Sequence, residues 1–421
     1  MAPRICRGSE AGPQEFKNDI VFDLLLKDGT VIDPSQNLHA LCDVVIHQGK
    51  IAGIAPTIPS SRAERVIDLG GHLLTPGLID LHTHVAEHFM PIAANAEEAG
   101  VNSGVTTVCD AGSVGYAAYN AFKHHIVSRA ETDVFCFLHL SPTGQMISPE
   151  ICWESLDTQR LLDLLAVEKQ TIKGIKIRAN GQLVANPNLT MLRVAREICA
   201  QAGLPLMIHI GLNFEEKVAG QTLSDFNRRM LPLLEPGDIL THTYTSRPGG
   251  VISADTGVLP ELREAMERGV ILDAAPAKSH FSFPLARIGL DAGILPTVLS
   301  TDITRTNYQG PALFSLPVVM SKFLALGLGL EDVVARTTIV PAQILKEPQR
   351  GSLLPGNPAD LTIFERLDGN FLFSDGIAGN TLVVSQLLEP RMAIKDGQIF
   401  PAQSRFRNHV PGEEVTLTKG A

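Results

Sequence analysis

Short apolar runs along this chain end repeatedly in residues that bind divalent metal ions. His82 and His84 lie two positions apart in the run GLIDLHTH. In a β-strand such residues share one face, so both imidazoles can bind the same ion. Later runs end in the same kinds of residue, namely His209, His242 and Asp302. Because imidazole and carboxylate are natural ligands of zinc, and also of manganese, iron and cobalt, the pattern predicts metal-assisted chemistry.

The whole set of residues carries this prediction, and no single member does. One HxH pair is more often accidental than metal-binding, and one strand histidine is more often a satisfied core residue. Repeated placement at matching strand ends makes coincidence a poor explanation. His139, at the end of another run, is intermediate between a supporting residue and a pocket-lining one. Seven further histidines are interpreted as structural: His39, His47, His72, His88, His124, His125 and His409.

The elements that must position these ligands are short apolar strands that alternate with helix-like stretches. Near-continuous apolar strands favour a parallel sheet covered by helices, and eight such units favour closure into a (β/α)8, TIM-like barrel. An open doubly wound sheet is the alternative. In a barrel the carboxyl ends of all strands meet at one face, where active sites lie. The expected strands are 77–84, 106–112, 133–140, 174–179, 205–210, 238–244, 270–276 and 296–302.

The two ends of the chain resemble each other in composition. DLLLKDGTVID and DVVIHQGKIAGIAP near the start, like PADLTIFE and PRMAIKDGQIF near the end, are short strands separated by hairpin turns. We expect both ends to pair into one small, discontinuous β-sandwich domain. The predicted parts are a flexible tail (1–15), the N-terminal part of the sandwich (16–75), the barrel (76–347) and the C-terminal part of the sandwich (348–421).

Composition favours small-molecule chemistry. The 421 residues, 44% of them hydrophobic, can bury one large core, and the formal charge of -10 is spread without a basic stripe for nucleic acid or an anionic membrane. The first residues contain no apolar signal segment, and no later run is long enough to span a membrane. The six cysteines show no CxxC spacing. We therefore expect reduced cysteines and a cytoplasmic protein.

The segment GGHLLTPGLIDLHTHV resembles the opening of the amidohydrolase superfamily barrel, and the similarity extends over nearly the whole chain. GTVIDP, GKIAGIAP and LLPGNPADLTIF resemble the split β-sandwich of that superfamily. The resemblance implies a metal-dependent hydrolase. Members with a lysine late in the fourth strand carboxylate it with carbon dioxide, and the carbamate bridges two metals. GIKIR matches this element, which implies a carboxylated Lys176, whereas Lys173 lies on the other face of the strand.

The resemblance also implies how the ligands divide. His82, His84 and Asp302 would bind the more buried of two divalent ions, expected to be zinc, His209 and His242 the more exposed one, and Lys176 both. Two such ions can hold a bridging hydroxide as the nucleophile and polarise a carbonyl. Asp302 would then also accept the proton of the hydroxide and pass it to the leaving group.

GIKIR, PLMIHIG, DILTH, FSF and STD together resemble a subgroup of deacetylases that look like dihydroorotases. That likeness implies hydrolysis of small acetylated 2-hydroxy acids such as acetyl-(R)-mandelate, with weak activity on N-acetyl-D-amino acids. Two departures concern the substrate. Ala275 and Pro276 stand where the subgroup often has a His-Gly pair, with His280 nearby, and STD is followed by ITRTN in place of a further histidine.

Arg178 lies two residues after Lys176 and so shares its face near the barrel mouth. Its guanidinium could hold a substrate carboxylate or assist the developing oxyanion, and an ion pair within the barrel is the competing interpretation. Further pocket candidates come from loops after the sixth to eighth strands: Tyr244, His280, Arg305 and Asn307.

The nearest rival function is another cyclic amide or N-acyl hydrolase of the superfamily, of the dihydroorotase, hydantoinase or D-aminoacylase type, which would act on C–N bonds in place of carboxylic esters. A non-catalytic barrel scaffold is the remote alternative, and it predicts missing ligands, whereas this chain has all of them. We expect a small acetylated carboxylic acid as the partner, with no nucleic acid and no membrane. Related barrels commonly assemble, so a homo-oligomer is compatible with the resemblance.

Overall fold

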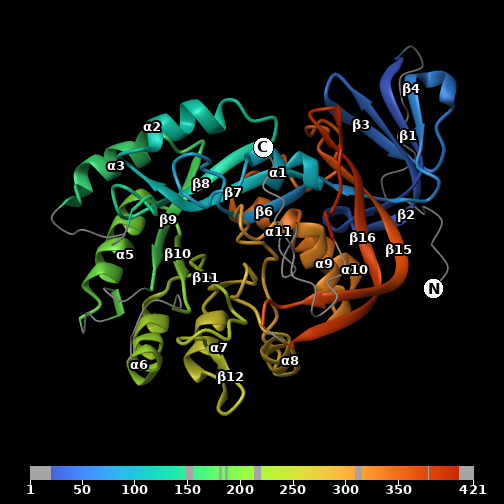
Figure 1. Cartoon of the computed structure of the whole chain (residues 1–421). Coiled ribbons are helices and arrows are strands. Elements are labelled where there is room, and N and C mark those ends of the chain that lie inside the picture. Colours follow the sequence, from blue (N-terminus) through green and yellow to red (C-terminus); the bar gives the residue numbers. More distant parts are fainter. Residues whose placement is uncertain are drawn as a thin grey trace, which may run out of the picture.

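The computed structural model describes residues 20–147, 155–179, 183–184, 188–212, 220–308, 315–377 and 379–406. Two large sheets organise them: a parallel sheet surrounded by helices, and a mixed sheet built from both ends of the chain (Figure 1). The predicted flexible tail and His409 lie outside the described residues.

Seven strands form the parallel sheet, in the order in which they follow along the chain. Every pairing between neighbours is parallel. The eighth expected strand makes only single parallel bridges, from Val298 to Asp273 and from Ile303 to Thr83, which join the segment to both edges of the sheet. The seven strands are β6 (Leu78–Thr83), β7 (Val105–Gly115), β8 (Asp133–His139), β9 (Ile172–Arg178), β10 (Leu206–His209), β11 (Ile239–Thr241) and β14 (Ile271–Asp273).

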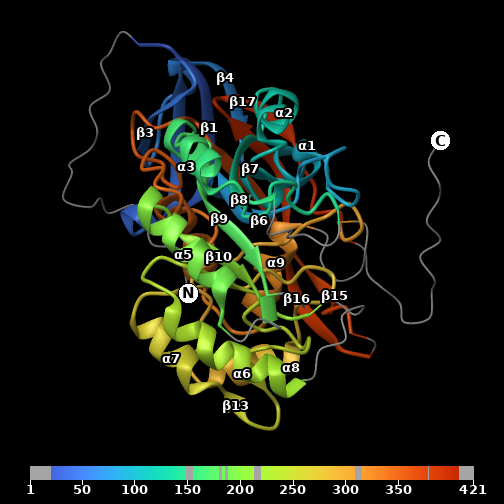
Figure 2. The ribbon, with the colours of Figure 1, turned by 90° about the vertical axis from the view of Figure 1, so that its left-hand side faces the viewer.

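Helices lie between successive strands and cover the outer side of the sheet (Figure 2). In α5 (Thr190–Ala202) the buried residues Met191, Ala195 and Ile198 recur at helical spacing, and the helix ends at Gly203 in the left-handed conformation. The other helices are α1 (Ala96–Ala99), α2 (Tyr119–Phe122), α3 (Thr158–Val167), α6 (Gly220–Met230), α7 (Pro260–Glu267), α8 (Phe283–Asp291), α9 (Leu316–Ala325), α10 (Leu330–Ala335) and α11 (Ile339–Ile344).

The mixed sheet joins the two ends of the chain through β5 (Leu73–Pro76), which pairs with β1 (Phe22–Asp33) on one side and β15 (Leu361–Ser374) on the other. The two ends of the chain thus form one continuous sheet, and not the two packed sheets of the expected sandwich. Side chains from the N-terminal and the C-terminal strands of this sheet nevertheless share one hydrophobic core. The remaining strands of this sheet are β2 (Leu38–His47), β3 (Lys50–Ala55), β4 (Ala63–Asp68), β16 (Thr381–Lys395) and β17 (Gln398–Pro401).

A small hairpin, β12 (Ile252–Ser253) and β13 (Gly257–Val258), extends the loop after β11. Within the described ranges no helix is both long enough and apolar enough to cross a membrane. Cys109, Cys136 and Cys199 are buried free thiols, as predicted. Cys42 is disulfide-bonded, which contradicts the prediction that all six cysteines are reduced.

Candidate metal centre

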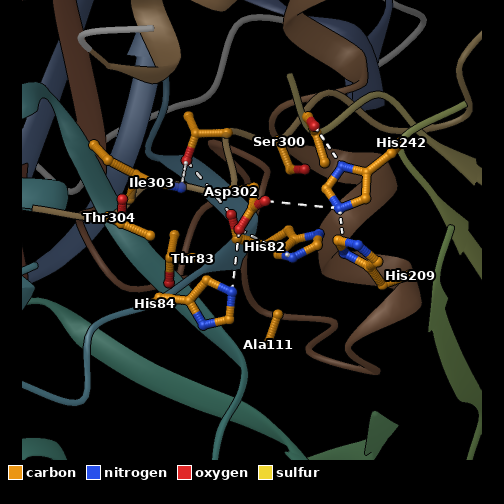
Figure 3. Close-up of polar contacts among 12 residues, drawn as sticks. His82, Thr83, His84, Ala111, His209, His242, Ser300, Asp302, Ile303 and Thr304 are labelled. Carbon is orange, nitrogen blue, oxygen red and sulfur yellow. Dashed lines mark hydrogen bonds and ion pairs between the residues drawn. The ribbon is translucent and has the colours of Figure 1, made fainter. Parts of the chain in front are cut away.

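Five of the six predicted ligand residues lie close together beyond the carboxyl ends of the parallel strands (Figure 3): His82, His84, His209, His242 and Asp302. Asp302 lies at the middle of the cluster: its Oδ1 is 3.1 Å from Nε2 of His84 and 3.5 Å from Nε2 of His82, and its Oδ2 is 3.6 Å from Nε2 of His242. Nε2 of His242 lies 2.8 Å from Nδ1 of His209. Side chains from separate strands therefore meet around one buried carboxylate.

The cluster divides into two groups of three residues. Within each group the ligand atoms lie within 4.8 Å of one another. We call His82, His84 and Asp302 the inner group, and His209, His242 and His280 the outer group. His242 and Asp302 have positive φ angles of 68° and 55°, which are uncommon for residues with a Cβ atom. The backbone is thus held in unfavourable conformations at two of the strand ends that carry the predicted ligands.

In the inner group, His82 is oriented by a buried carboxylate. Nδ1 of His82 lies 3.0 Å from Oδ2 of Asp273, whose other oxygen accepts a hydrogen bond from Ser300. Because a carboxylate accepts, Nδ1 carries the proton and the lone pair of Nε2 faces the cluster. Asp273 was not predicted as a functional residue. The available signal was an acidic residue at the end of the strand segment VILD.

His84 is oriented in a similar way through a hydroxyl. Nδ1 of His84 lies 2.7 Å from Oγ of Ser113, which donates to Asp110 over 2.8 Å. The single hydroxyl proton is therefore committed to Asp110, so Ser113 accepts from His84. Nε2 of His84 is left unprotonated and points toward Asp302.

In the outer group, backbone carbonyls take the role of the carboxylates. His242 donates from Nδ1 to the carbonyl of Ala275 over 2.7 Å, and His209 donates from Nε2 to the carbonyl of Gly211 over 3.0 Å. The two remaining ring nitrogens, both lone pairs, face each other at 2.8 Å. Two facing lone pairs repel unless a cation binds them, so this pair of residues fits a divalent ion.

Burial lowers the pKa of His82, and it lowers the pKa values of His209 and His242 well below the ordinary value. The imidazoles are thereby kept neutral, which is the form that binds a metal.

Lys176 is fully buried, with Nζ 3.2 Å from Nε2 of His82 and 3.4 Å from Sδ of Met207. Burial lowers its pKa to about 8. Only a neutral amine can add carbon dioxide, so this shift favours carboxylation. Gly112 provides the room: a Cβ atom there would lie 2.7 Å from Cβ and Cγ of Lys176. Lys173 contacts Glu347 at 2.6 Å instead, in agreement with its expected position on the other face.

A cavity of about 240 Å³ opens above the cluster. Arg178 lines it, as predicted, and donates to Oε1 of Gln145 over 3.2 Å. Arg247 lines the cavity too. From the sequence, its segment SRPGG is expected as a wall of the pocket, but Arg247 itself is not among the predicted substrate-binding residues. Its Nε donates to the carbonyl of Ser279 over 3.2 Å. The cavity also has an apolar part, formed by Met90 and Ile92.

Two predicted pocket residues lie elsewhere. Tyr244 is buried in the core, where its hydroxyl donates to the carbonyl of Ile294 over 2.8 Å and its ring packs against Phe281. Arg305 is exposed and donates to the carbonyl of Pro91. Neither residue lines the cavity, in contrast to the position expected from the sequence.

Asn307 does line the cavity, but its side chain also holds the loop that carries Asp302. Its Nδ2 donates to the carbonyl of Asp302 over 2.9 Å, and its Oδ1 accepts from the backbone of Thr304. His139 is buried beside Lys176 in the register of β8 and β9, and its Nδ1 accepts from the backbone of Ser141. Both residues thus support the strand ends.

Comparisons with known proteins agree with this geometry. The model of the amidohydrolase family matches residues 73–399. A deacetylase of Brucella anthropi is 28% identical over 376 residues, covering 88% of this chain and 90% of the relative. A deacetylase of Enterococcus faecalis is 29% identical over 383 residues, covering 90% and 99%. A solved structure of a dihydroorotase superposes with a TM-score of 0.79 at 26% identity, covering 93% and 99%. The chain belongs to the amidohydrolase family of metal-dependent hydrolases.

Proposed function

We propose that this protein is a deacetylase that hydrolyses acetyl esters of small 2-hydroxy acids, of the acetyl-(R)-mandelate type, with weaker activity on N-acetyl-D-amino acids. One observation carries the proposal: four imidazoles at the floor of a small cavity have their protons directed away from the cluster. The lone pairs of His82, His84 and His242 face the buried carboxylate of Asp302, and the lone pair of His209 faces His242. These residues would hold two divalent ions, with zinc the first expectation, and a carboxylated Lys176 would bind both.

When bound, the two ions would supply an activated water and a Lewis acid for the carbonyl oxygen. Asp302 is placed to move the proton. Its Oδ1 faces His82 and His84 of the inner group, and its Oδ2 faces His242 of the outer group. One carboxylate therefore contacts histidines of both groups. It would accept the proton of the attacking water and return it to the leaving alkoxide.

The cavity lining favours a small carboxylic acid. The guanidinium of Arg178 is held by Gln145, and that of Arg247 by the backbone of Ser279. Fixed guanidinium groups match carboxylate geometry better than a flexible lysine does. Met90 and Ile92 supply an apolar surface for a side chain such as phenyl. Relatives that are named deacetylase, and that match this chain over most of their length, support removal of an acetyl group.

The fold that carries this function is proposed to be a complete (β/α)8 barrel (76–347) with a discontinuous β domain (16–75 and 348–421), in which one continuous sheet takes the place of the expected sandwich. The single bridges of Val298 and Ile303 to both edges of the parallel sheet support closure. Pairing of β5 with β15 supports one domain made from both ends.

A cyclic amide hydrolase is the second candidate, because the solved dihydroorotase shares the fold over nearly the whole chain. Such enzymes would use the same ligands with different loops. The deciding experiment offers the metal-loaded enzyme acetylated 2-hydroxy acids of both hands, N-acetyl amino acids, dihydroorotate and hydantoins. We expect the fastest hydrolysis with an acetylated 2-hydroxy acid. Hydrolysis confined to dihydroorotate would overturn the proposed substrate.

A further inference from the structure

The loop after β14 brings a third imidazole to the outer group. The ring of His280 stacks on that of His242, with centroids 4.3 Å apart, and meets the ring of His209 edge-on at 4.8 Å. His280 is buried, and its ligand atom lies within 4.8 Å of those of the other two histidines. From the sequence, His280 is expected only as a pocket residue.

The backbone of this loop is held in an unfavourable conformation that directs His280 back to the cluster. Ala275 and Ala277 have φ angles of 32° and 49°, a region that residues with a Cβ atom avoid. Three hydrogen bonds enforce it: the Ala275 carbonyl accepts from His242, the amide of Ala277 donates to Thr301, and the amide of His280 donates to Pro276. Strain kept in place by its surroundings is common at functional sites.

We propose that His280 is a third imidazole ligand of the divalent ion held by His209 and His242. This inference rests on the two-ion centre of the proposed function. It gives the outer group three side-chain ligands of its own, like the inner group. It also ties the outer ion to the cavity wall, because Ser279, next to His280, holds the guanidinium of Arg247.

The test measures metal binding without substrate, on the full-length protein freed of metal. Zinc is titrated against a competing chelator into the wild type, His280→Ala and His280→Asn, with Lys278→Ala as the control from the same loop and cavity wall. An amide side chain keeps hydrogen bonding but is a poor zinc ligand. Circular dichroism and thermal unfolding check that each variant is folded, and two substitutions guard against failure of one.

We expect two ions in the wild type and in Lys278→Ala. Both His280 variants should keep the first ion and bind the second at least about tenfold more weakly, since loss of even an indirect contact to a metal costs about 10–100-fold. In the cobalt-substituted protein, only the His280 variants should change the visible absorption of the second ion. If both folded His280 variants bind the second ion with wild-type affinity, the assignment of His280 as a ligand is wrong, while the two-ion centre still stands. Fewer than two ions in the wild type would overturn the two-ion centre itself, and this assignment with it.

Discussion

The inner and outer groups contain similar ligands but are held in different ways. In the inner group, His82 and His84 are oriented by side chains, through Asp273 and through Ser113 with Asp110. In the outer group, His209 and His242 are oriented by backbone carbonyls of the loops that follow the strands. A carboxylate raises the basicity of an imidazole ligand more than a neutral carbonyl does. The inner group is thus built for tight binding, and the outer group depends on loop conformation.

Asp302 contacts both groups, so its replacement should have the largest effect. We expect Asp302→Asn to fold and to lose kcat by at least about a thousandfold, because the amide cannot accept the proton. Steady-state kinetics on the acetylated substrate measure the loss, and thermal unfolding confirms the fold. A variant that hydrolyses the ester at the wild-type rate would contradict the proton-transfer role.

Lys176 should also affect both groups at once. Lys176→Ala should lose metal and activity together, and short-chain carboxylic acids should restore part of both by replacing the carbamate. Lys322→Ala is the matched control, since Lys322 is an equally buried lysine that donates to the carbonyl of Ser374, away from the centre. If Lys176→Ala keeps its metal content, the bridging assignment fails.

Asp273 should affect the inner group alone. Asp273→Asn weakens the support of His82, and we expect the affinity for the more tightly bound ion to fall by about 10–100-fold while the second ion is little changed. Asp238→Asn serves as control, because Asp238 is a buried acid that pairs with Arg196 near the opposite ends of the strands. Equal losses of affinity for both ions in Asp273→Asn would contradict the proposed difference between the two groups. An equally large loss of affinity in Asp238→Asn would contradict it too.

The smallest expected effect is the pH dependence of metal loading. With the pKa of Lys176 lowered to about 8 by burial, the neutral amine fraction rises as the pH rises toward that value. At constant dissolved carbon dioxide, the rate at which the metal-free protein takes up metal should rise about tenfold for each unit of pH increase up to the pKa of Lys176. Above that pKa the rate should level off. A loading rate that does not change with pH would argue against carboxylation of this amine.

The sequence was sufficient to place the candidate ligands at strand ends and to locate seven of the eight expected strands. The period of two in a strand fixes which side chains share a face, so His82 and His84 could be paired from spacing alone. Loop side chains lack this constraint. Tyr244 was placed in the pocket by its position after a strand, but its side chain enters the core, and Thr304 and Thr306 line the cavity where Arg305 does not.

The partners that orient the imidazoles could not be read from the sequence. Asp273 is 191 residues from His82, and Ser113 is 29 residues from His84, so only the fold brings them together. The partners of His209 and His242 are backbone carbonyls, which every residue has, so no residue type in the sequence indicates them. The tautomers, and with them the strongest support for a metal centre, therefore required the structure.

The central claim is that two divalent ions occupy the inner and outer groups, and crystals grown with zinc test it most directly through anomalous scattering. We expect two peaks about 3.5–4 Å apart, one among His82, His84 and Asp302 and the other beside His209 and His242. Each should lie about 2.0–2.1 Å from the imidazole nitrogens. A single ion, or none at these residues in zinc-containing crystals, would contradict the account.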